Sequence, residues 1–279
     1  MPRFNRVTIV GLGLIGGSLG MAIKRHRLAR EVVGVSRRIT TLREAKRRGA
    51  IDRGTTDARR AVRDADLVIL ATPVDVILSQ AGRLAQHMPP GSILSDVGSS
   101  KATIVRTLER TLPKHVAFVG AHPIAGTEQR GIEAADAHLF DRSLCIVTRT
   151  SKTNRQALRR VASLWRQVSG AVMFLAPAEH DRLLGETSHL THLIACTLVH
   201  STSRHALARP PRSWLEMTRI AKSDPDLWDD IFLSNRAAVA KAMDRFDRQW
   251  HVLRRLLARH DRAGLRRALR RAKSLRDAC

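Results

Sequence analysis

Residues 7–20 read VTIVGLGLIGGSLG, and this stretch decides the fold. A short β-branched run leads into Gly-x-Gly-x-x-Gly and then a helical pattern, as in the first βα unit of a dinucleotide-binding sheet. Gly11 permits a tight turn, Gly13 lets the backbone approach a pyrophosphate, and Gly16 lets helix and strand pack closely. The N-terminus of the helix that follows offers free N–H groups to phosphates, and Leu14 and Ile15 lie in the same loop. We therefore expect these five residues to bind a dinucleotide.

The end of the second expected strand, residues 32–35, bears on the choice of cofactor. It is followed by Ser36 and Arg37, where NAD enzymes usually place an Asp or Glu that accepts hydrogen bonds from the ribose 2′-hydroxyl. Ser36 can donate to a 2′-phosphate and Arg37 can pair with it, which favours NADP. NAD stays open, because Arg37 and Arg38 would look the same as ordinary surface arginines.

Short apolar runs alternate with amphipathic helical patterns as far as residue 175. Strands are predicted at residues 7–10, 32–35, 67–71, 93–95, 117–121, 144–148 and 172–175. Helices are predicted between several of them, at residues 18–26, 40–48, 74–86 and 154–168. This alternation predicts an α/β chain with a mainly parallel, Rossmann-like sheet. We expect that domain to cover residues 1–176, and a helical substrate-binding and dimerisation domain to cover residues 177–279.

The helical half begins after Pro177 and carries a long apolar stripe. Asp224-Pro225-Asp226 is typical of a helix start. The stripe follows it at spacings of three and four, with Val239, Met243, Phe246, Trp250, Leu253 and Leu257 on one face. Such a seam can be the core of a helical domain or a dimer interface. We expect it to serve as both, so that the protein is a homodimer.

The composition narrows the class of protein. The net charge of +24 invites a nucleic-acid function, but the basic residues are spread along the chain and only 4% of residues are aromatic. We expect instead an arginine-rich solvated surface that attracts anionic substrates and phosphorylated cofactors, with no nucleic-acid partner. No apolar run reaches the roughly 20 residues of a membrane helix, and no signal-peptide pattern precedes the first strand. A cytoplasmic protein is expected, with its three cysteines reduced and far apart.

Candidate chemistry lies at the expected strand ends, where an open α/β sheet binds its ligands. The segments are ATP at 71–73, DVGSSK at 96–101 and HPIAG at 122–126. A histidine at such an end is well placed as a base because its ordinary pKa is near neutrality, although His122 alone could equally be a loop histidine. Glu186, His189 and His192 lie three apart on one helical face, but no second motif completes a metal site, so we expect no metal.

Taken together, these segments resemble the prephenate/arogenate dehydrogenase family of tyrosine biosynthesis. The matching segments are the loop at 11–18, DVGS at 96–99, GAHPIAGTE at 120–128, SHLTH at 188–192 and TRIA at 218–221. They follow the family's order over nearly the whole chain. The resemblance implies an NAD(P)-dependent oxidative decarboxylation, in which hydride leaves the carbinol carbon of a cyclohexadienol and the ring carboxylate departs as carbon dioxide.

The resemblance also implies roles for individual residues. His122 would accept the proton of the substrate hydroxyl, and Ser99 would hold His122 or that hydroxyl in position. Arg219 would grip a substrate carboxylate with two hydrogen bonds. The remaining expectations are substrate contact at His192, support at His189, a place near the substrate side chain for Glu128, and cofactor contact at Thr72 and Pro73.

One segment departs from the family pattern. Relatives usually have Gly-Gly-Phe-x-Asp before the Thr-Arg pair, whereas residues 210–216 here read PPRSWLE. The substrate is therefore left open between prephenate, arogenate and an amino-substituted prephenate of specialised metabolism. A basic binding protein that has lost catalysis is the alternative from another class, and the joint presence of His122, Ser99 and Arg219 argues against it. No appended regulatory domain is expected beyond Cys279.

Overall fold

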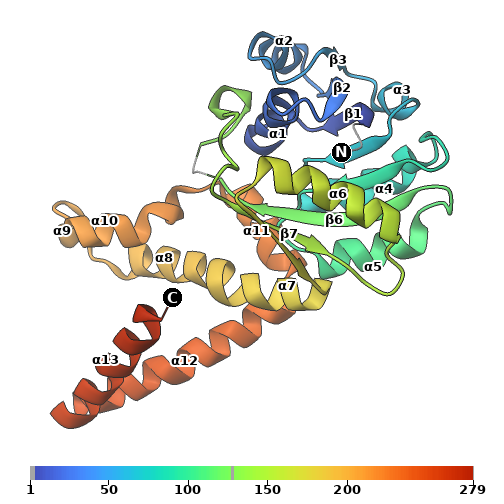
Figure 1. The fold of residues 1–279 in the computed structure, drawn as a ribbon. Coiled ribbons are helices and arrows are strands. Elements are labelled where there is room, and N and C mark those ends of the chain that lie inside the picture. The colour runs from blue at the N-terminus through green and yellow to red at the C-terminus, as the bar shows by residue number, and fades with distance from the viewer. Residues whose placement is uncertain (1–3, 127–128, 279) are drawn as a thin grey trace.

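The computed structural model describes residues 4–126 and 129–278, which form a sheet domain with a helical extension on one side (Figure 1). The eight-stranded sheet has the order β3-β2-β1-β4-β5-β6-β7-β8. The strands are β1 (Phe4–Val10), β2 (Ala29–Val35), β3 (Arg53–Thr55), β4 (Leu67–Leu70), β5 (Ile93–Asp96), β6 (Ala117–Ile124), β7 (Leu144–Thr148) and β8 (Ala171–Leu175). All neighbouring pairs are parallel except β6 and β7.

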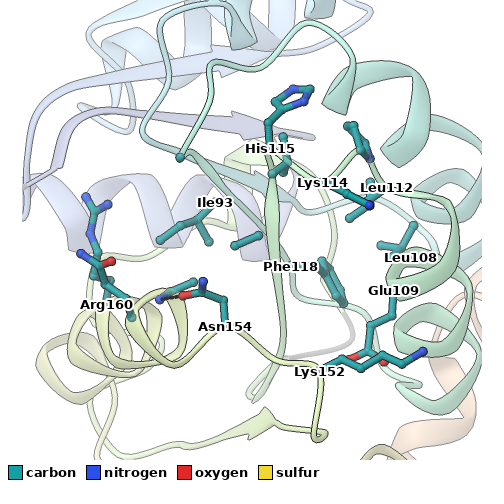
Figure 2. A pocket seen from close by; sticks show the side chains of 16 residues that line it. Ile93, Leu108, Glu109, Leu112, Lys114, His115, Phe118, Lys152, Asn154 and Arg160 are labelled. Atoms are coloured by element: carbon teal, nitrogen blue, oxygen red, sulfur yellow. Dashed lines mark hydrogen bonds between the residues drawn. The ribbon is translucent and has the colours of Figure 1, made fainter.

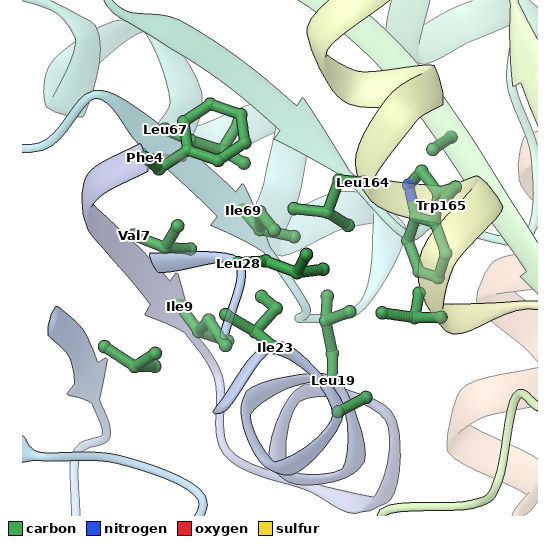
Figure 3. Close-up of a cluster of buried hydrophobic side chains, with 14 of the residues drawn as sticks. Phe4, Val7, Ile9, Leu19, Ile23, Leu28, Leu67, Ile69, Leu164 and Trp165 are labelled. Carbon is green, nitrogen blue, oxygen red and sulfur yellow. The ribbon is translucent and has the colours of Figure 1, made fainter. Parts of the chain in front are cut away.

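Helices cover both faces of the sheet, because successive strand residues point to opposite sides. On β1, Val7 and Ile9 face α1 (Leu14–Arg25), α2 (Ile39–Arg47) and α6 (Arg155–Val168) in one apolar cluster, part of which is shown in Figure 3. Val10 belongs to the cluster on the other face, under α3 (Ala58–Val62), α4 (Val74–Ala85) and α5 (Ala102–Thr111). Two apolar layers on a parallel sheet confirm the predicted α/β class.

The helical half begins with a long rod made of α7 (Pro177–Leu184), the π-helical turn η2 (Gly185–His189) and α8 (Leu190–Ser201) (Figure 1). The other elements of this half are α9 (Arg204–Leu207), α10 (Arg212–Thr218), η3 (Arg219–Lys222), α11 (Pro225–Ser234), α12 (Arg236–Ala258) and α13 (Arg262–Asp277). The short 3-10 helix η1 (Ile132–Ala134) belongs to the sheet domain, where it packs against α1 and α2. Asp224 caps α11 by accepting the N–H of Asp226 at 3.0 Å, which confirms the helix start that was predicted there.

Three elements were not predicted. β3 has only three residues, Arg53-Gly54-Thr55, which carry no strand pattern, and it is held at the sheet edge by parallel pairing with β2. The other two are the helices α3 and α5. These differences lengthen the sheet and fill its second face without changing the fold class.

The apolar stripe of α12 is mostly uncovered in the single chain. Val239 is buried, whereas Met243, Phe246, Trp250 and Leu257 are between 40% and 61% exposed. Within one chain the stripe is therefore core only at its first residue, and the rest of it is a surface that a second molecule could cover. None of the helices in the described part of the chain is both long enough and apolar enough to span a membrane.

Two carboxylates of the helical half bind backbone groups of the sheet domain. Asp230 on α11 accepts the N–H of Val74, the first residue of α4, at 2.7 Å. Asp181 on α7 accepts the N–H of Lys101 at 2.7 Å and of Ala102 at 2.9 Å, where α5 begins. Both contacts lie at helix N-termini that follow the carboxyl ends of strands, so the two halves meet at the edge where ligands are expected.

Candidate active site

Two glycines of the loop after β1 are required by the protein itself. Gly11 has φ of +97°, and a Cβ there would lie 2.4 Å from the carbonyl oxygen of Ala71. A Cβ on Gly16 would lie 1.9 Å from the carbonyl oxygen of Gly11. Any larger side chain at either position would force the turn away from β4, so both glycines serve the local packing that was predicted for them.

Gly13 is different, because nothing in the described protein requires a glycine there. Its backbone is extended, with φ of −86° and ψ of −158°, and a Cβ would meet no atom within 4 Å. It is the N-cap of α1, no side chain caps that helix, and the first turn contains no acidic residue. Leu14 and Ile15 are the first residues of α1, and their backbone N–H groups therefore lie beside open space. This cradle fits the pyrophosphate of a dinucleotide.

Alanine at Gly13 is expected to separate folding from cofactor binding. Gly13→Ala should change the free energy of unfolding by less than about 1 kcal/mol, because Ala replaces Gly at an uncapped N-cap without a clash. It should weaken NAD(P) binding about 10- to 100-fold by displacing phosphate from one or two N–H groups. Thermal denaturation and cofactor fluorescence titration measure the two effects. Gly16→Ala is the comparison, and it should lose stability; equal cofactor affinity in Gly13→Ala and the parent would contradict the cradle.

The other expected cofactor residues surround this loop. Gly11 donates its N–H to the carbonyl of Val35 at 3.0 Å. Ser36, the next residue after Val35, therefore lies beside the loop. Arg37 is exposed. Thr72 lies against Gly11, and its Oγ1 is buried without a hydrogen-bond partner in the described residues. Pro73 is the N-cap of α4. The structure therefore brings Ser36, Arg37, Thr72 and Pro73 to the same edge as the glycine loop.

His122 lies in β6 near its carboxyl end and belongs to a buried chain of hydrogen bonds. Its Nδ1 lies 2.9 Å from Nε2 of His180, and Nδ1 of His180 lies 2.8 Å from Oδ1 of Asp181. A carboxylate only accepts, so His180 carries its proton on Nδ1 and presents a lone pair at Nε2. His122 must then donate from Nδ1, which leaves the lone pair of its Nε2 free. The arrangement fixes the tautomer that a general base needs.

The protonation states of this chain agree with that role. Burial lowers the pKa of His122 well below its ordinary value, and the neighbouring His180 and Lys101 lower it further by charge repulsion. Burial also lowers the pKa of His180. Burial alone would raise the pKa of Asp181, but hydrogen bonds from His180 and from two backbone N–H groups bring it below the usual value. At neutral pH the chain therefore consists of two neutral imidazoles and one carboxylate.

A buried ion pair lies beneath the same strand ends. Lys101 and Asp96 are both fully buried, and the lysine ammonium bonds the carboxylate. Asp96 also accepts the N–H of Gly98 at 2.9 Å, which fixes the turn that carries Ser99. Ser99 is partly exposed on this turn, whereas the neighbouring Ser100 is fully buried with an Oγ that has no hydrogen-bond partner among the described residues. The structure thus places Ser99 at the expected strand end, and no hydrogen bond joins it to His122 among the described residues.

His192 lies on α8 in an aromatic setting. Its ring stacks on Trp228 at 3.7 Å between centroids, and its Nδ1 is buried without a hydrogen-bond partner in the part of the chain that the structure describes. Burial lowers its pKa, so the ring is neutral. A buried polar atom without a partner is costly unless a ligand satisfies it. His192 therefore has the features of a substrate contact.

His189 is buried inside the helical half. Its Nδ1 lies 3.1 Å from Nδ2 of Asn235, and that same Nδ2 donates to the carbonyl of Asp181 at 2.7 Å. Burial lowers the pKa of His189 to about 4. His189 therefore supports the residue that orients His180. It ends the π-helical turn η2, a kind of turn that often occurs at functional sites.

The remaining expected residues are placed as follows. Arg219 begins η3, which packs against α8, the helix of His192. Glu128 lies outside the described residues. Residues 212–216, which depart from the family pattern, form part of α10 and are largely exposed. Of the three residues that were weighed as metal ligands, Glu186 pairs with Arg245 at 2.9 Å. No cluster of three or more potential metal ligands is found among residues 4–126 and 129–278.

His180, Asp181, Lys101 and Asp96 were not among the site residues predicted from the sequence. Asp96 and Lys101 lie inside the DVGSSK segment, but a spacing of five residues does not by itself indicate an ion pair. His180-Asp181 is an adjacent pair at the start of the helical half. The sequence offered one clue, an acidic residue next to a histidine in a helix that begins at Pro177. Only the packing of α7 against α5 shows that this pair lies beside His122.

A glycine loop that fits a pyrophosphate, a mainly parallel sheet and a neutral histidine at the carboxyl ends of its strands are typical of a nicotinamide-dependent dehydrogenase. The family models agree with this class: residues 19–174 match the nucleotide-binding domain of prephenate dehydrogenase, and residues 176–271 match its dimerization domain. The chain belongs to the prephenate dehydrogenase family. The family resemblance and the coarser cofactor prediction, a nicotinamide dinucleotide, are thereby confirmed.

Individual relatives match nearly the whole of this chain. The chain is 34% identical to the cyclohexadienyl dehydrogenase of Zymomonas mobilis, over 94% of this chain and 91% of the relative. It is 32% identical to the prephenate dehydrogenase of Bacillus subtilis, over 97% of this chain and 75% of the relative. The crystal structure of prephenate dehydrogenase from Aquifex aeolicus with hydroxyphenyl propionate and NAD+ matches with a TM-score of 0.90 and 34% identity, over 98% of both chains.

Proposed function

We propose that this protein oxidatively decarboxylates prephenate, arogenate or both, with NAD(P) as the hydride acceptor. The observation that carries the proposal is the hydrogen-bonded chain from Asp181 through His180 to His122, which leaves Nε2 of His122 as a free base at the ligand edge of the sheet. Family membership supports the choice of substrate class.

The proposed reaction uses the residues of this chain for proton transfer and for binding. A bound nicotinamide supplies a hydride acceptor for the carbinol carbon. As that carbon becomes a carbonyl carbon, the hydroxyl proton passes to Nε2 of His122. The carbon–carbon bond to the ring carboxylate then breaks, carbon dioxide leaves, and the bonding electrons complete the aromatic ring while its oxygen takes back a proton. The reaction thus removes one hydride, transfers one proton and releases one carbon dioxide.

His180 and Asp181 stabilise the charge that develops on His122. Once His122 accepts a proton, its Nδ1–H faces the lone pair of His180, whose other nitrogen donates to a carboxylate. The buried carboxylate of Asp181 therefore stabilises the positive charge on His122, two hydrogen bonds away. Such interactions are strong in a low-dielectric setting. Ser99 is proposed to hold the substrate hydroxyl or His122, as the resemblance implies.

Two carboxylates on the substrate call for cationic and hydrogen-bonding groups. We assign His192 to one of them, because its buried Nδ1 lacks a partner among the described residues. Arg219 is assigned to the other as a bidentate clamp. Glu128 is proposed to lie near the substrate side chain, and His189 is proposed to support the site through Asn235. The departure at residues 210–216 leaves an amino-substituted prephenate as the second candidate substrate.

The proposed function is tested by offering the purified protein each substrate with each cofactor. Prephenate, arogenate and an amino-substituted prephenate would each be mixed with NAD+ and with NADP+, and the absorbance of the reduced cofactor would be followed. Turnover of prephenate or arogenate is the expected result. Turnover of the amino-substituted compound alone would move the assignment to the second candidate. Absence of turnover in all six mixtures, from protein that binds cofactor, would refute the enzymatic proposal.

The preference for NADP is a separate proposal, supported by Ser36 and the exposed Arg37 beside the glycine loop. Arg37→Ala should lower kcat/KM for NADP+ about 10- to 100-fold, because a hydrogen-bonded charge pair contributes about 1.5–3 kcal/mol, and should leave that for NAD+ nearly unchanged. Arg30→Ala is the matched control, since Arg30 is exposed near the other end of the same strand. Equal losses with both cofactors would contradict the preference.

Arg219→Ala is expected to raise the substrate KM about 10- to 100-fold with a smaller effect on kcat, because a carboxylate clamp acts in both the ground state and the transition state. Initial-rate kinetics at saturating cofactor would measure both constants. Lys222→Ala removes an exposed cation from the same element, η3, and should leave KM near the parent value. A loss confined to kcat would show that Arg219 does not act as a clamp.

The remaining proposals concern organisation. We place the domain boundary at residues 176 and 177, because β8 ends at Leu175 and α7 begins at Pro177. We also propose that the protein is a homodimer through its helical half, supported by the match to the dimerization domain and by the uncovered stripe on α12. Finally, we propose that the protein is located in the cytoplasm.

A further inference from the structure

A cavity lies near the amino ends of β5 and β6, at the other end of the strands from His122. It has a volume of about 580 Å³ and is formed by the end of α5, the beginning of β6 and the beginning of α6 (Figure 2). The volume falls within the range of small-molecule sites, roughly 300–1,000 Å³. None of the cofactor or substrate residues assigned above lines this cavity.

The cavity combines an apolar floor with cations at its rim. Ile93, Leu108 and Phe118 are buried at its base. The cations are Lys114, Lys152 and Arg160, which approach from different elements (Figure 2). An anion with an apolar body is the class of ligand that such a surface binds, because its carboxylate can meet the cations while its body covers the floor.

Within the described part of the chain, the rim cations are not paired with carboxylates. Lys114, Lys152 and Arg160 form no ion pair with any carboxylate of the described residues, although Glu109 also lines the cavity. Glu109 instead accepts a hydrogen bond from Thr150. Arg160 is held in place by its guanidinium, which lies 4.4 Å from the ring centroid of Phe4. The cavity therefore has an excess of positive charge.

The same elements connect the cavity to the catalytic chain. α5 lines the cavity with Leu108 and Glu109 near its end, and the N–H of Ala102 at its start binds the carboxylate of Asp181. A helix of this length spans on the order of 15 Å. β6 lines the cavity with Phe118 and reaches His122 four residues later, about 13 Å along a strand. A ligand that shifts α5 or β6 would therefore act on the orientation of His122.

We propose that this cavity is a regulatory site for a small organic carboxylate with an aromatic or other apolar body. The carboxylate of the ligand is attracted by the positive charge of Lys114, Lys152 and Arg160, which lie on different sides of the cavity (Figure 2), and its apolar body lies beside Ile93, Leu108 and Phe118. Its occupancy changes turnover through α5 and β6. The binding does not depend on the proposed function, whereas the effect on turnover rests on it.

Binding is tested by lysine footprinting with 3-phenylpropionate as the probe. Amine acylation read by mass spectrometry should slow about tenfold at Lys114 and Lys152 at a probe concentration of ten times Kd, following simple mass action. Lys46, which is exposed on α2, is the internal control and should react unchanged. The uncharged 3-phenylpropionamide should not protect either lysine. Absence of protection, equal protection by the amide, or equal protection by inorganic phosphate would overturn the assigned ligand class.

Coupling is tested by kcat at saturating substrate, where competition at the active site is overcome. 3-Phenylpropionate should change kcat of the parent protein, and Lys114→Ala/Lys152→Ala should abolish this response while keeping the basal kcat. Lys46→Ala/Arg59→Ala removes the same amount of charge from exposed positions and should keep the response. Footprint protection without a change in kcat would overturn the coupling. Since footprinting needs no turnover, failure of the proposed function leaves the binding result interpretable.

Discussion

His122→Asn is expected to lower kcat about 10²- to 10⁴-fold while the affinity for cofactor stays near the parent value. The size of the effect is that of removing a positioned general base, and asparagine keeps a polar group of similar size in the site. Cofactor affinity should persist, because the glycine loop follows β1, whereas His122 lies in β6. Stopped-flow absorbance would measure turnover, and fluorescence titration would measure cofactor binding.

The pH dependence provides a second readout for His122. Burial lowers its pKa well below 6.5, so the base is neutral at pH 7 and is lost only as the pH falls through that lowered pKa. In the parent protein kcat/KM should therefore hold through pH 6.5 and decline at lower pH, and the residual rate of His122→Asn should lack this limb. His205→Asn, at an exposed position on α9, is the matched control. Full activity in His122→Asn would show that another group is the base.

Asp181→Asn is expected to lower kcat by a comparable factor through the tautomer of two histidines. The amide can donate to Nδ1 of His180, which would turn Nε2 of His180 into a donor and move the proton of His122 onto its Nε2. The base would then be blocked. The corresponding exchange beside the histidine of serine proteases lowers kcat about 10⁴-fold, and an effect on the order of 10²- to 10⁴-fold is expected here. The pH profile should change along with kcat.

Asp181 also binds two backbone N–H groups of α5, so a loss of activity in Asp181→Asn could have a structural origin. His180→Gln separates the two roles, because it breaks the chain to His122 and leaves the contact between Asp181 and α5 in place. Both variants should lose kcat, whereas only Asp181→Asn should lower Tm appreciably. If His180→Gln kept full activity, the chain would not be needed to orient the base.

The glycine loop and His122 could be predicted because each lies in a short segment whose residues act locally. Gly11, Gly13 and Gly16 share one turn, and His122 follows an apolar strand within a recognisable segment. The chain behind His122 could not be predicted in this way. His180 is 58 residues away in the other half of the protein, and it reaches His122 only because α7 packs against α5 and β7.

Short elements and elements at the sheet edge also could not be predicted from the sequence. β3 is a strand because β2 pairs with it, since Gly54 and its charged neighbour Arg53 have no strand preference of their own. The apolar stripe of α12 shows the opposite case. Its period of three and four predicted a buried face, yet in one chain only Val239 is buried. The period shows which residues share a face, but it does not show whether the same molecule supplies the surface that covers them.

The contact of Asp181 with Lys101 and Ala102 has a consequence for how this protein can be divided or recombined. The sheet domain contains the cofactor cradle and the histidine, but the carboxylate that sets the histidine's proton belongs to the other half. In a sheet domain expressed alone, the histidine is expected to be free to take either tautomer, because the carboxylate that orients His180 is missing. A chimaera built from two relatives would need complementary partners on α5 and α7.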